Sequence, residues 1–549
     1  MLIPEMMKSI HCRIPIFILF IYAGILSPVK VLAQAEYLPH SYQFNQKLNE
    51  TLYDGKNNIH TSLKPYLITP AIRLRYDSLM NLGTDTTRKG WIPRKLLNEH
   101  LIDIKTDQYT FYADFLPDLQ IGRDFKRNNK TWLNTRGYQF GLNIGDRFSF
   151  YTSGYENQAL FTPYVHDFIN QYKVVPGQSI KDFDPNNKDT DFSYVTAVMS
   201  YAAIKDHLNI TFGHDKNFIG DGYRSLFLSD VSSPYTSLKL TGELGKVQYM
   251  SMWAYMIDPL APRFSMDRGV ANQYKWGAFQ FLDWNISSRV SIGLFQSVIW
   301  SPTNLDGSYR GVNLNYLNPV IFLRPMETMD SNSPDKIHLG VSGKYKPFKN
   351  MVLYGQFQLD DFKAKEFFSN RGFSHNKWAA QAGVKGYNVF GVKNLNYLAE
   401  YNLARPYTYS HFKGITSYSN NAQPLAHPFG ANFREYLTIW NYSAGRFDFQ
   451  LHGSYGTYGL DQYGWNSGKD IFKSYDEFTT DYGNRIGQGL STQLFYAESR
   501  AAYVINPKYN LRIEAGYTYR NEDNKNYNNK TSLFTIGLRS TFRNLYYDF

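Results

Sequence analysis

Cysteine and long apolar runs are scarce in this sequence. Its 549 residues include one cysteine, Cys12, just before an apolar run over residues 14–26. Basic residues before that run and the small residues Ala33-Gln34-Ala35 after it match a secretory signal peptide over residues 1–35. A retained anchor is the alternative, although the run is shorter than the ~20 residues that a spanning helix needs. We therefore predict an exported mature chain without thiols, which excludes disulfides, cysteine-ligated metals and a cysteine nucleophile.

The mature part has no further long apolar stretch, and the mean hydropathy of the chain is −0.44, which excludes membrane-spanning helices. Aromatic residues are nevertheless abundant, with 45 Tyr, 39 Phe and 9 Trp. Such a chain is compatible with a membrane if it crosses as strands whose lipid-facing and lumen-facing residues alternate between aromatic girdles. A large soluble β-sandwich or propeller is the competing fold.

The charge balance is mildly basic. Without residues 1–35 the formal net charge falls from +11 to +9, from 55 basic and 46 acidic residues. This excess suits acidic glycans or anionic lipid headgroups. There is no Lys/Arg-rich run or nucleic-acid motif, so we expect no nucleic-acid partner.

Residues 36–107 differ from the rest of the chain. Thr69-Pro70 followed by Gly83 predicts a short helix with threonine at its cap, proline at its first position and glycine past its end. Pro93 predicts the start of a second helix, with Leu97, Leu101 and Ile104 on one stripe. We interpret residues 36–107 as a periplasmic N-terminal segment with short helices.

From residue 108 to residue 549 the hydrophobic period changes to two, as in Phe447, Phe449, Leu451 and Tyr455. About 18 strand-like runs follow, which predicts an all-β transmembrane barrel of about 18 antiparallel strands in the outer membrane. Polar residues on the opposite face are predicted to face the lumen: Lys344, Glu400, His452, Arg512, Glu514 and Arg520. Polar, aromatic stretches predict long surface loops that contact sugars, at residues 161–189, 217–233, 362–376, 404–430 and 459–485.

The C-terminus resembles the assembly signal of outer-membrane barrels, because Phe549 is preceded by Tyr547 and Leu545 at alternate positions. Phe534, Ile536, Leu538 and Phe542 alternate in the other register. A β-bulge near Arg543-Asn544 would reconcile the two registers within one final strand.

Residues 212–229 form the densest unusual segment, with three glycines among charged residues. A phosphate loop would need a Lys-Ser/Thr pair and a following helix, and a calcium loop would need more acidic ligands. Asp215 and Asp221 could act as a glycosidase pair, but such pairs are common in long chains. We predict no catalytic, cofactor or metal site here. The segment is interpreted as a tightly structured loop with candidate ligand contacts at His214, Asp215, Lys216, Gly220, Asp221, Gly222, Arg224 and Ser225.

The same segment carries a family resemblance. The stretch GHDKNFIGDGYRSLFLS resembles the glycine-rich segment of capsule-assembly outer-membrane proteins of the Wzi type, and YLNPVIF at residues 316–322 resembles their Asn-Pro segment. The likeness is closest to a branch called RemB, on residues 112–124, residues 135–138 and the RNLYYDF end. It implies an 18-stranded barrel with a small periplasmic helical part. It also implies a lectin-like role with capsular polysaccharide or an adhesive role in gliding motility.

We therefore expect a non-enzymatic outer-membrane barrel with surface-exposed loops. Its expected partners are surface or capsular polysaccharide, outer-membrane lipid, and other motility or polysaccharide-export proteins. The first alternative is a diffusion channel, because charged residues across a lumen can line an open pore as well as lock a closed one. The second is a secreted glycan hydrolase with a β fold, suggested by the abundant Asp, Glu and Trp.

Overall fold

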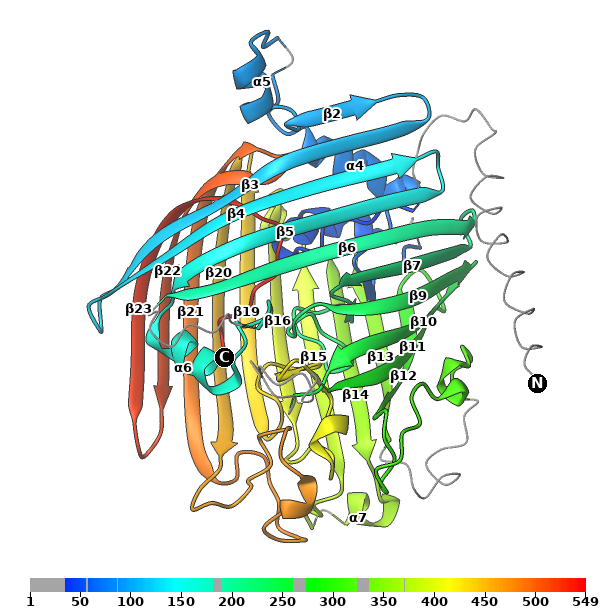
Figure 1. Cartoon of the computed structure of the whole chain (residues 1–549), viewed down its shortest axis with the longest axis vertical. Coiled ribbons are helices and arrows are strands. Elements are labelled where there is room, and N and C mark those ends of the chain that lie inside the picture. The colour runs from blue at the N-terminus through cyan, green and yellow to red at the C-terminus, as the bar shows by residue number, and fades with distance from the viewer. Residues whose placement is uncertain are drawn as a thin grey trace, which may run out of the picture.

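A computed structural model describes residues 35–55, 58–85, 87–180, 189–259, 273–322, 335–369 and 371–549. The predicted signal peptide therefore lies outside the described residues, apart from Ala35. Nineteen strands form one antiparallel sheet, and 18 of them close into a barrel, as predicted (Figure 1). The ring closes where β23 pairs with β3. The remaining strand, β2 (Ile102–Lys105), pairs only with β3.

The 18 barrel strands are β3 (Tyr109–Asp124), β4 (Asn129–Ile144), β5 (Phe148–Leu160), β6 (Thr190–Ile204), β7 (Leu208–Asp215), β9 (Tyr235–Leu244), β10 (Val247–Ile257), β11 (Tyr274–Asn285), β12 (Val290–Trp300), β13 (Lys336–Phe348), β14 (Met351–Asp361), β15 (Lys377–Gly386), β16 (Leu395–Ala404), β19 (Phe433–Ala444), β20 (Phe447–Leu460), β21 (Leu490–Asn506), β22 (Leu511–Asp523) and β23 (Asn528–Ser540).

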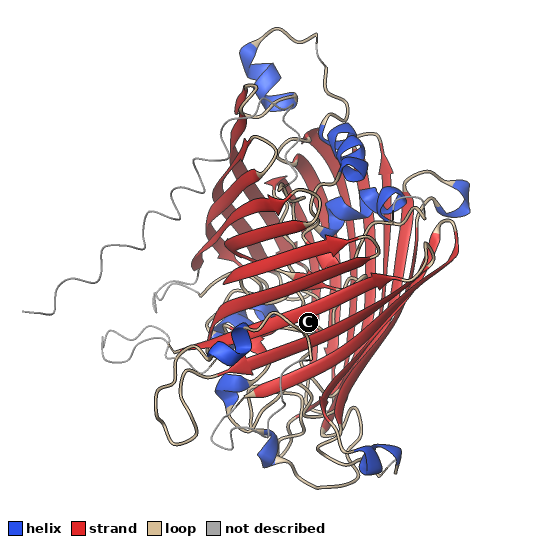
Figure 2. Cartoon of the chain, turned by 90° about the vertical axis from the view of Figure 1, so that its right-hand side faces the viewer, coloured by secondary structure: helices blue, strands red, loops and turns tan. Residues whose placement is uncertain are grey.

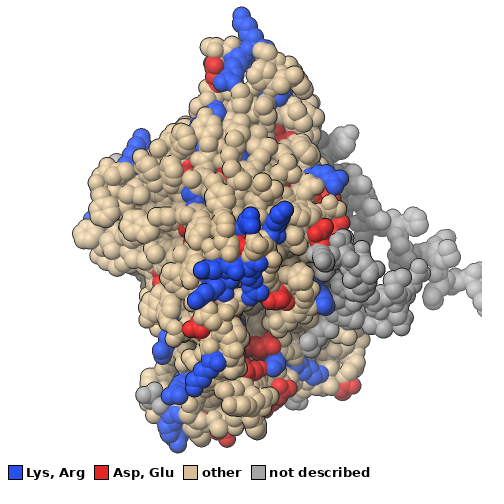
Figure 3. Space-filling model, turned by 90° about the vertical axis from the view of Figure 1, so that its left-hand side faces the viewer, with Lys and Arg blue, Asp and Glu red and all other residues tan. Residues whose placement is uncertain are grey.

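Apolar and polar residues alternate along the strands, and the apolar ones face outward. On β20, Phe447, Phe449 and Leu451 are exposed, whereas Asp448 and His452 are buried. Figure 3 shows a broad stretch of the outer wall with few charged side chains. The predicted alternation is confirmed, and its direction is the one that a barrel in lipid requires.

The two ends of the barrel differ. At one end, eight short connections join the strands, such as the two-residue turn between β9 and β10, where Gly245 takes a φ of +62°. We call this end the short-turn rim. The other end, the long-loop rim, carries the long connections and only two short ones, β3–β4 and β22–β23. Figure 2 shows helices at both ends.

Outside the barrel wall the described elements are short. The helices are α2 (Tyr42–Asn45), η1 (Gln46–Leu48), α3 (Asn49–Leu52), α4 (Pro70–Met80), α5 (Trp91–Leu97), α6 (Pro163–Tyr172), η2 (Leu314–Leu317), α7 (Ala364–Phe368), η3 (Val389–Gly391), η4 (Gly414–Thr416) and η5 (Tyr475–Glu477). Two small sheets pair β1 (Leu63–Lys64) with β8 (Phe218–Ile219) and β17 (Ser419–Asn420) with β18 (Gln423–Pro424). No helix within the described residues is both long and apolar enough to cross a membrane.

The segment before the barrel enters the lumen. Helix α4 starts at Pro70 with Thr69 as its N-cap residue, where the sequence predicts it. The second helix, α5, ends at Leu97, and Ile104 lies in β2 instead, because residues 102–105 complete the edge of β3. Residues 36–68, which we call the N-terminal plug, pack inside the barrel, which the sequence analysis did not anticipate. For example, Tyr37 Oη and Thr211 Oγ1 of β7 are 2.8 Å apart.

The prediction of a surface loop is wrong for two segments, because both fold into the lumen. Residues 217–233 and 404–430 are largely buried. Their apolar side chains, including Phe227, Tyr409 and Tyr418, pack against Phe281 and Phe295 of the inner wall. The rings of Phe227 and Phe295 stack with centroids 4.7 Å apart. These loops thus provide the core of the molecule rather than a surface.

The prediction of a β-bulge within one final strand is also wrong. Strand β23 ends at Ser540, and residues 541–549, the C-terminal tail, turn into the lumen. Phe542 packs on Phe44 of the N-terminal plug, and Phe549 packs on Phe168 of α6. Buried partners inside the barrel explain the register break at Arg543-Asn544 without a bulge.

Candidate functional site

The loop between β7 and β9 crosses the lumen and is its structural centre. Residues 216–233, which we call the interior loop, pair with the N-terminal plug through β8 and β1. Ser225 Oγ donates to the carbonyl of Ile219 at 2.5 Å and accepts from the amide of Phe227, which closes a tight turn. At Gly222 an added Cβ would clash with the carboxylate of Glu400, so the backbone can approach the wall only without a side chain.

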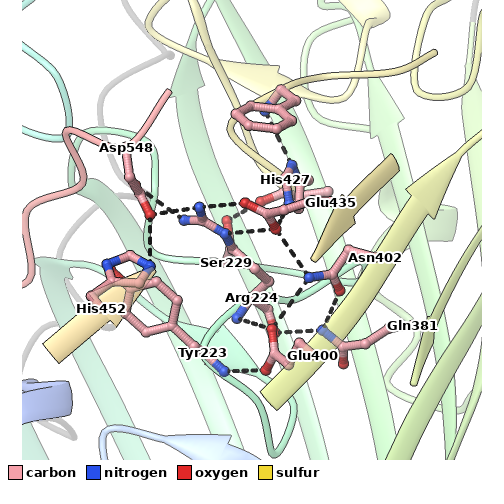
Figure 4. Close-up of polar contacts among 12 residues, drawn as sticks. Tyr223, Arg224, Ser229, Gln381, Glu400, Asn402, His427, Glu435, His452 and Asp548 are labelled. Atoms are coloured by element: carbon pink, nitrogen blue, oxygen red, sulfur yellow. Dashed lines mark hydrogen bonds and ion pairs between the residues drawn. The ribbon is translucent and has the colours of Figure 1, made fainter. Parts of the chain in front are cut away.

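Arg224 joins three parts of the chain (Figure 4). Its Nη2 donates to Oε1 of Glu435 on β19 at 2.8 Å and to Oδ2 of Asp548 in the C-terminal tail at 2.7 Å. His427 Nε2 lies 2.7 Å from the other oxygen of Glu435. All four side chains are buried. Because a buried charge is tolerated only with close partners, this cluster fixes loop, wall and tail to one another.

The backbone around Arg224 is held by the inner wall. Glu400 of β16 accepts from the amides of Tyr223 at 2.6 Å and Arg224 at 3.2 Å. Gln381 of β15 donates to the carbonyl of Arg224 at 3.0 Å. Figure 4 shows these side chains converging on the loop from neighbouring strands. The loop thus has partners for its backbone as well as for its charge.

Asp221 anchors the N-terminal plug. Its carboxylate accepts from Tyr53 Oη at 2.9 Å, Thr61 Oγ1 at 2.5 Å and Ser62 Oγ at 3.0 Å. Lys344 of β13 lies 3.6 Å away. The acceptor-only carboxylate is surrounded by donors from the plug and by a cation from the wall, so plug, loop and wall are linked here as well.

Asp230 anchors the N-terminal plug and the C-terminal tail. It accepts from Asn544 Nδ2 at 2.9 Å and from Tyr546 Oη at 2.7 Å, both in the C-terminal tail, and lies 2.9 Å from Nε2 of His40 in the plug. Lys216 donates to its carbonyl at 2.8 Å. Asp221, Arg224 and Asp230, three charged residues of one loop, therefore attach the plug, the tail and the wall.

The carboxyl groups of Asp221 and Asp230 both have a pKa that favours the ionised form at neutral pH. Burial raises the pKa of Asp221, but Lys344, Lys385 and the hydrogen bond from Thr61 lower it by more, so the pKa lies below its ordinary value. Burial also raises the pKa of Asp230, and the hydrogen bond and charge of His40 again outweigh it, so that pKa too lies below its ordinary value. At neutral pH both groups hold their partners by charge-assisted hydrogen bonds.

The structure divides the residues predicted for the 212–229 segment. Gly220, Asp221, Gly222, Arg224 and Ser225 come together in the interior loop. Lys216 belongs to the same loop and, together with Asp215 at the end of β7, lies at the edge of a cavity. His214 is exposed on the outer side of β7 and takes no part. The predicted ligand-contact loop therefore holds the plug, the tail and the inner wall together through Asp221, Arg224 and Asp230. We call these three residues and their partners the clamp.

The six predicted lumen-facing residues are all buried: Lys344, Glu400, His452, Arg512, Glu514 and Arg520. His452 Nε2 lies 3.5 Å from Asp548, and Arg520 Nε donates to the backbone oxygen O of Phe549 at 3.0 Å. The sequence analysis missed Asp230, the third charged anchor of the interior loop, and it missed Glu435 and Asp548, the two partners of Arg224. The acidic residue in an otherwise apolar C-terminus was the available signal for Asp548.

A cavity of about 480 Å³ remains between the plug, the interior loop and the inner wall from β3 to β9. Aromatic, acidic and basic side chains line it, among them Tyr37, Arg73, Tyr151, Asp215, Lys239 and Arg543. Arg543 lies over the ring of Tyr155, 4.0 Å from its centroid, and 2.9 Å from Gln178. Part of the lining comes from the plug, the interior loop and the tail, which the three anchors hold in place.

The long-loop rim carries the second candidate surface. Residues 371–376 and 461–485, which we call the rim platform, are joined by three backbone hydrogen bonds of 2.9–3.0 Å, such as Ser374 N to Asp481 O. Tyr463, Trp465 and Tyr482 are 88%, 58% and 42% exposed there. Arg371 stacks on Tyr482, 4.7 Å from the ring centroid. Exposed aromatic side chains on a fixed backbone can bind a flat, partly apolar ligand.

The closed ring, the apolar exterior and the filled polar interior define this protein as an outer-membrane β-barrel whose lumen is occupied by its own chain. By sequence, no family model and no curated protein matches it. By structure, it is similar to Wzi, an outer-membrane protein involved in group 1 capsule assembly in Escherichia coli and a carbohydrate-binding β-barrel. That likeness has a TM-score of 0.54 at 13% identity and covers 92% of this chain and 100% of Wzi.

Porins score lower. OprD of Pseudomonas aeruginosa gives a TM-score of 0.42 at 11% identity, covering 78% of this chain and 93% of OprD. OccAB2 of Acinetobacter baumannii gives 0.41 at 9% identity, covering 78% and 97%. The likeness to Wzi supports the barrel architecture that the sequence resemblance implied, and does not extend to the RemB branch.

Proposed function

We propose that the protein binds polysaccharide at the rim platform and holds it at the cell surface, without catalysing a reaction. The observation that carries this proposal is the set of exposed aromatic side chains Tyr463, Trp465 and Tyr482. They lie on a rim whose segments are joined by backbone hydrogen bonds, above a filled lumen. Aromatic faces pack on the apolar faces of pyranose rings, while neighbouring charged and amide groups bind hydroxyls. The carbohydrate-binding activity of Wzi supports the same ligand class by analogy of fold.

The polysaccharide is capsular in the first form of this proposal. In the second form, of RemB type, the same contact serves adhesion during gliding motility, with other motility or polysaccharide-export proteins as partners. Cells that lack the protein separate the two forms, because the first predicts loss of attached capsule and the second predicts loss of surface spreading with capsule unchanged.

Polysaccharide binding by rim variants tests the proposal. Replacing Tyr463, Trp465 and Tyr482 together with Ala should weaken binding of the cell's own surface polysaccharide at least about tenfold, since each stacked ring contributes roughly 0.5–1.5 kcal/mol. The matched control is Trp91→Ala with Phe390→Ala, two residues that are 62% and 86% exposed at the short-turn rim. Equal binding by the rim variant and the control would refute the proposed site.

A diffusion channel is the second candidate, favoured by the polar inner wall and by the 480 Å³ cavity. It requires a continuous water path through the lumen. The plug, the interior loop, residues 404–430 and the tail all occupy that lumen in the described structure, so the channel would need them to move. Ion conductance across a planar bilayer distinguishes the two candidates.

A further inference from the structure

Five basic side chains gather on the outer wall near the long-loop rim. Arg123, Lys126, Arg127 and Lys130 belong to the β3–β4 hairpin, and Lys530 lies on the adjoining strand β23. All five are exposed. The hairpin and β23 are neighbours, because Phe125 N donates to Ser532 O at 2.8 Å and Arg127 donates to Asn529 at 2.7 Å. We call these five residues the outer basic cluster.

The cluster is short of negative charge. Within the described part of the chain, none of the five has a carboxylate within 4.0 Å. Asp124, the acidic residue next to the turn of the hairpin, is buried and accepts from the amides of Lys126 and Ser532. Arg123 and Lys130 lie directly opposite each other across the hairpin. Like charges in that arrangement destabilise a sheet unless an anion lies between them.

Two of the guanidinium groups are held in place without being neutralised. Arg123 donates to the side chain of Asn128 and Arg127 to that of Asn529. A neutral amide orients a guanidinium but leaves its charge available. An oriented guanidinium matches the geometry of a phosphate, which it can bind through two parallel hydrogen bonds.

Large apolar residues adjoin the cluster on the same face. Ile121 of β3 and Phe125, the first residue after it, are 66% and 60% exposed, and Phe534, opposite Arg123, is exposed as well. Figure 3 shows Lys and Arg side chains gathered on this side of the barrel below the broad uncharged area, toward the long-loop rim. Basic groups thus lie where the lipid-facing surface gives way to the charged rim.

We propose that the outer basic cluster binds the phosphate groups of a phosphorylated glycolipid in the outer leaflet of the outer membrane, with its acyl chains against Ile121, Phe125 and Phe534. A free phosphate would use only the cations, whereas a lipid uses both the cations and the apolar residues beside them. Each cation near an anionic headgroup contributes to membrane attraction, and the attraction weakens with salt. This inference does not depend on the proposed polysaccharide site at the rim platform.

Binding of purified lipopolysaccharide to the detergent-solubilised full chain tests the inference. The variant Arg123→Gln/Lys126→Gln/Arg127→Gln/Lys130→Gln should bind it at least about tenfold more weakly than the unaltered protein. Dephosphorylating the lipid should have a comparable effect on the unaltered protein. The matched control removes four exposed charges at the short-turn rim, Lys246, Arg289, Lys349 and Lys393, and should bind normally.

Three results would overturn the inference: unchanged binding by the cluster variant, equal binding of phosphorylated and dephosphorylated lipid, or displacement of the lipid by inorganic phosphate at equal concentration. Binding of an acidic polysaccharide but not of the lipid would assign the cluster to another partner and overturn it too. If the fourfold variant fails to give a folded, heat-modifiable barrel, Lys126→Gln/Arg127→Gln in the turn keeps the test decisive, with a smaller expected loss of about threefold or more.

Discussion

The interior loop and the β3–β4 hairpin use the same residue types in opposite ways. Inside the barrel, Arg224 has two carboxylates within 2.8 Å. On the outer wall, the side chains of Arg123 and Arg127 have amide partners, and no carboxylate of the described residues lies within 4.0 Å of either. The guanidinium of Arg224 is buried and must find its counter-charges within the chain. A guanidinium at the membrane surface can leave its counter-charge to a partner. The comparison teaches that the paired cation serves the structure of the lumen, whereas the outer basic cluster is the surface that we propose for lipid binding.

Removing the paired cation should have the largest effect. Arg224→Met leaves Glu435 and Asp548 buried without their common partner, which costs about 3–5 kcal/mol of the free energy of unfolding. Arg127→Met on the outer wall should change it by less than about 0.5 kcal/mol. Urea-induced unfolding in lipid vesicles measures both. Similar losses in the two variants would break the distinction between paired and unpaired cations.

Deleting residues 544–549 should be nearly as costly. The deletion removes Asp548 from Arg224, Tyr546 from Asp230 and the buried packing of Phe549, for a loss of about 2–4 kcal/mol. The interior loop should then become open to proteolysis, which gel analysis of digests reveals. A truncated chain as resistant as the full one would show that the tail is not part of the clamp.

The close approach at Gly222 should give an intermediate effect. In Gly222→Ala the new Cβ meets the Glu400 carboxylate, and the displaced loop should lose about 1–3 kcal/mol. Gly343→Ala is the matched control, because a Cβ at Gly343 in β13 meets no atom within 4 Å. Thermal unfolding of the two variants compares them, and equal midpoints would contradict the described loop geometry.

Lowering the pH should have the smallest effect on the stability of the plug, as long as the pH stays above about 5. Asp221 has a pKa lowered in the folded state by Lys344, Lys385 and Thr61, so its contribution to stability is complete above its ordinary pKa of about 4. That contribution is lost as the pH falls through the lower folded-state pKa. Protease resistance of the plug should therefore be constant from pH 7 to pH 5 and should fall below about pH 4. In the variant Asp221→Asn, protease resistance should depend less on pH below about pH 4. The same pH profile in the variant and the unaltered protein would show that Asp221 does not cause the loss of resistance.

The barrel was predictable because its signal is local. The alternation of Phe447, Phe449 and Leu451 with polar residues follows directly from the two-residue period of a strand between lipid and lumen. The start of α4 followed from Thr69 and Pro70. The number of strands followed from counting such runs.

The filling of the lumen was not predictable, because it depends on contacts between distant segments. Residues 404–430 have the composition of a surface loop, yet Tyr409 and Tyr418 are buried against the inner wall. Composition does not distinguish an outward loop from one that folds inward. In the sequence, the turn of the C-terminal tail away from β23 was visible only as a break in the alternating register. A β-bulge was the simpler interpretation of that break.

The central claim is that the protein's own chain, clamped at Arg224, fills its lumen. Single-channel recording in a planar bilayer tests it most directly. The account predicts no steady ion conductance for the unaltered protein, and openings once the clamp is removed by Arg224→Met or by deletion of residues 544–549. A steady open pore in the unaltered protein, with the same conductance in both variants, would contradict it.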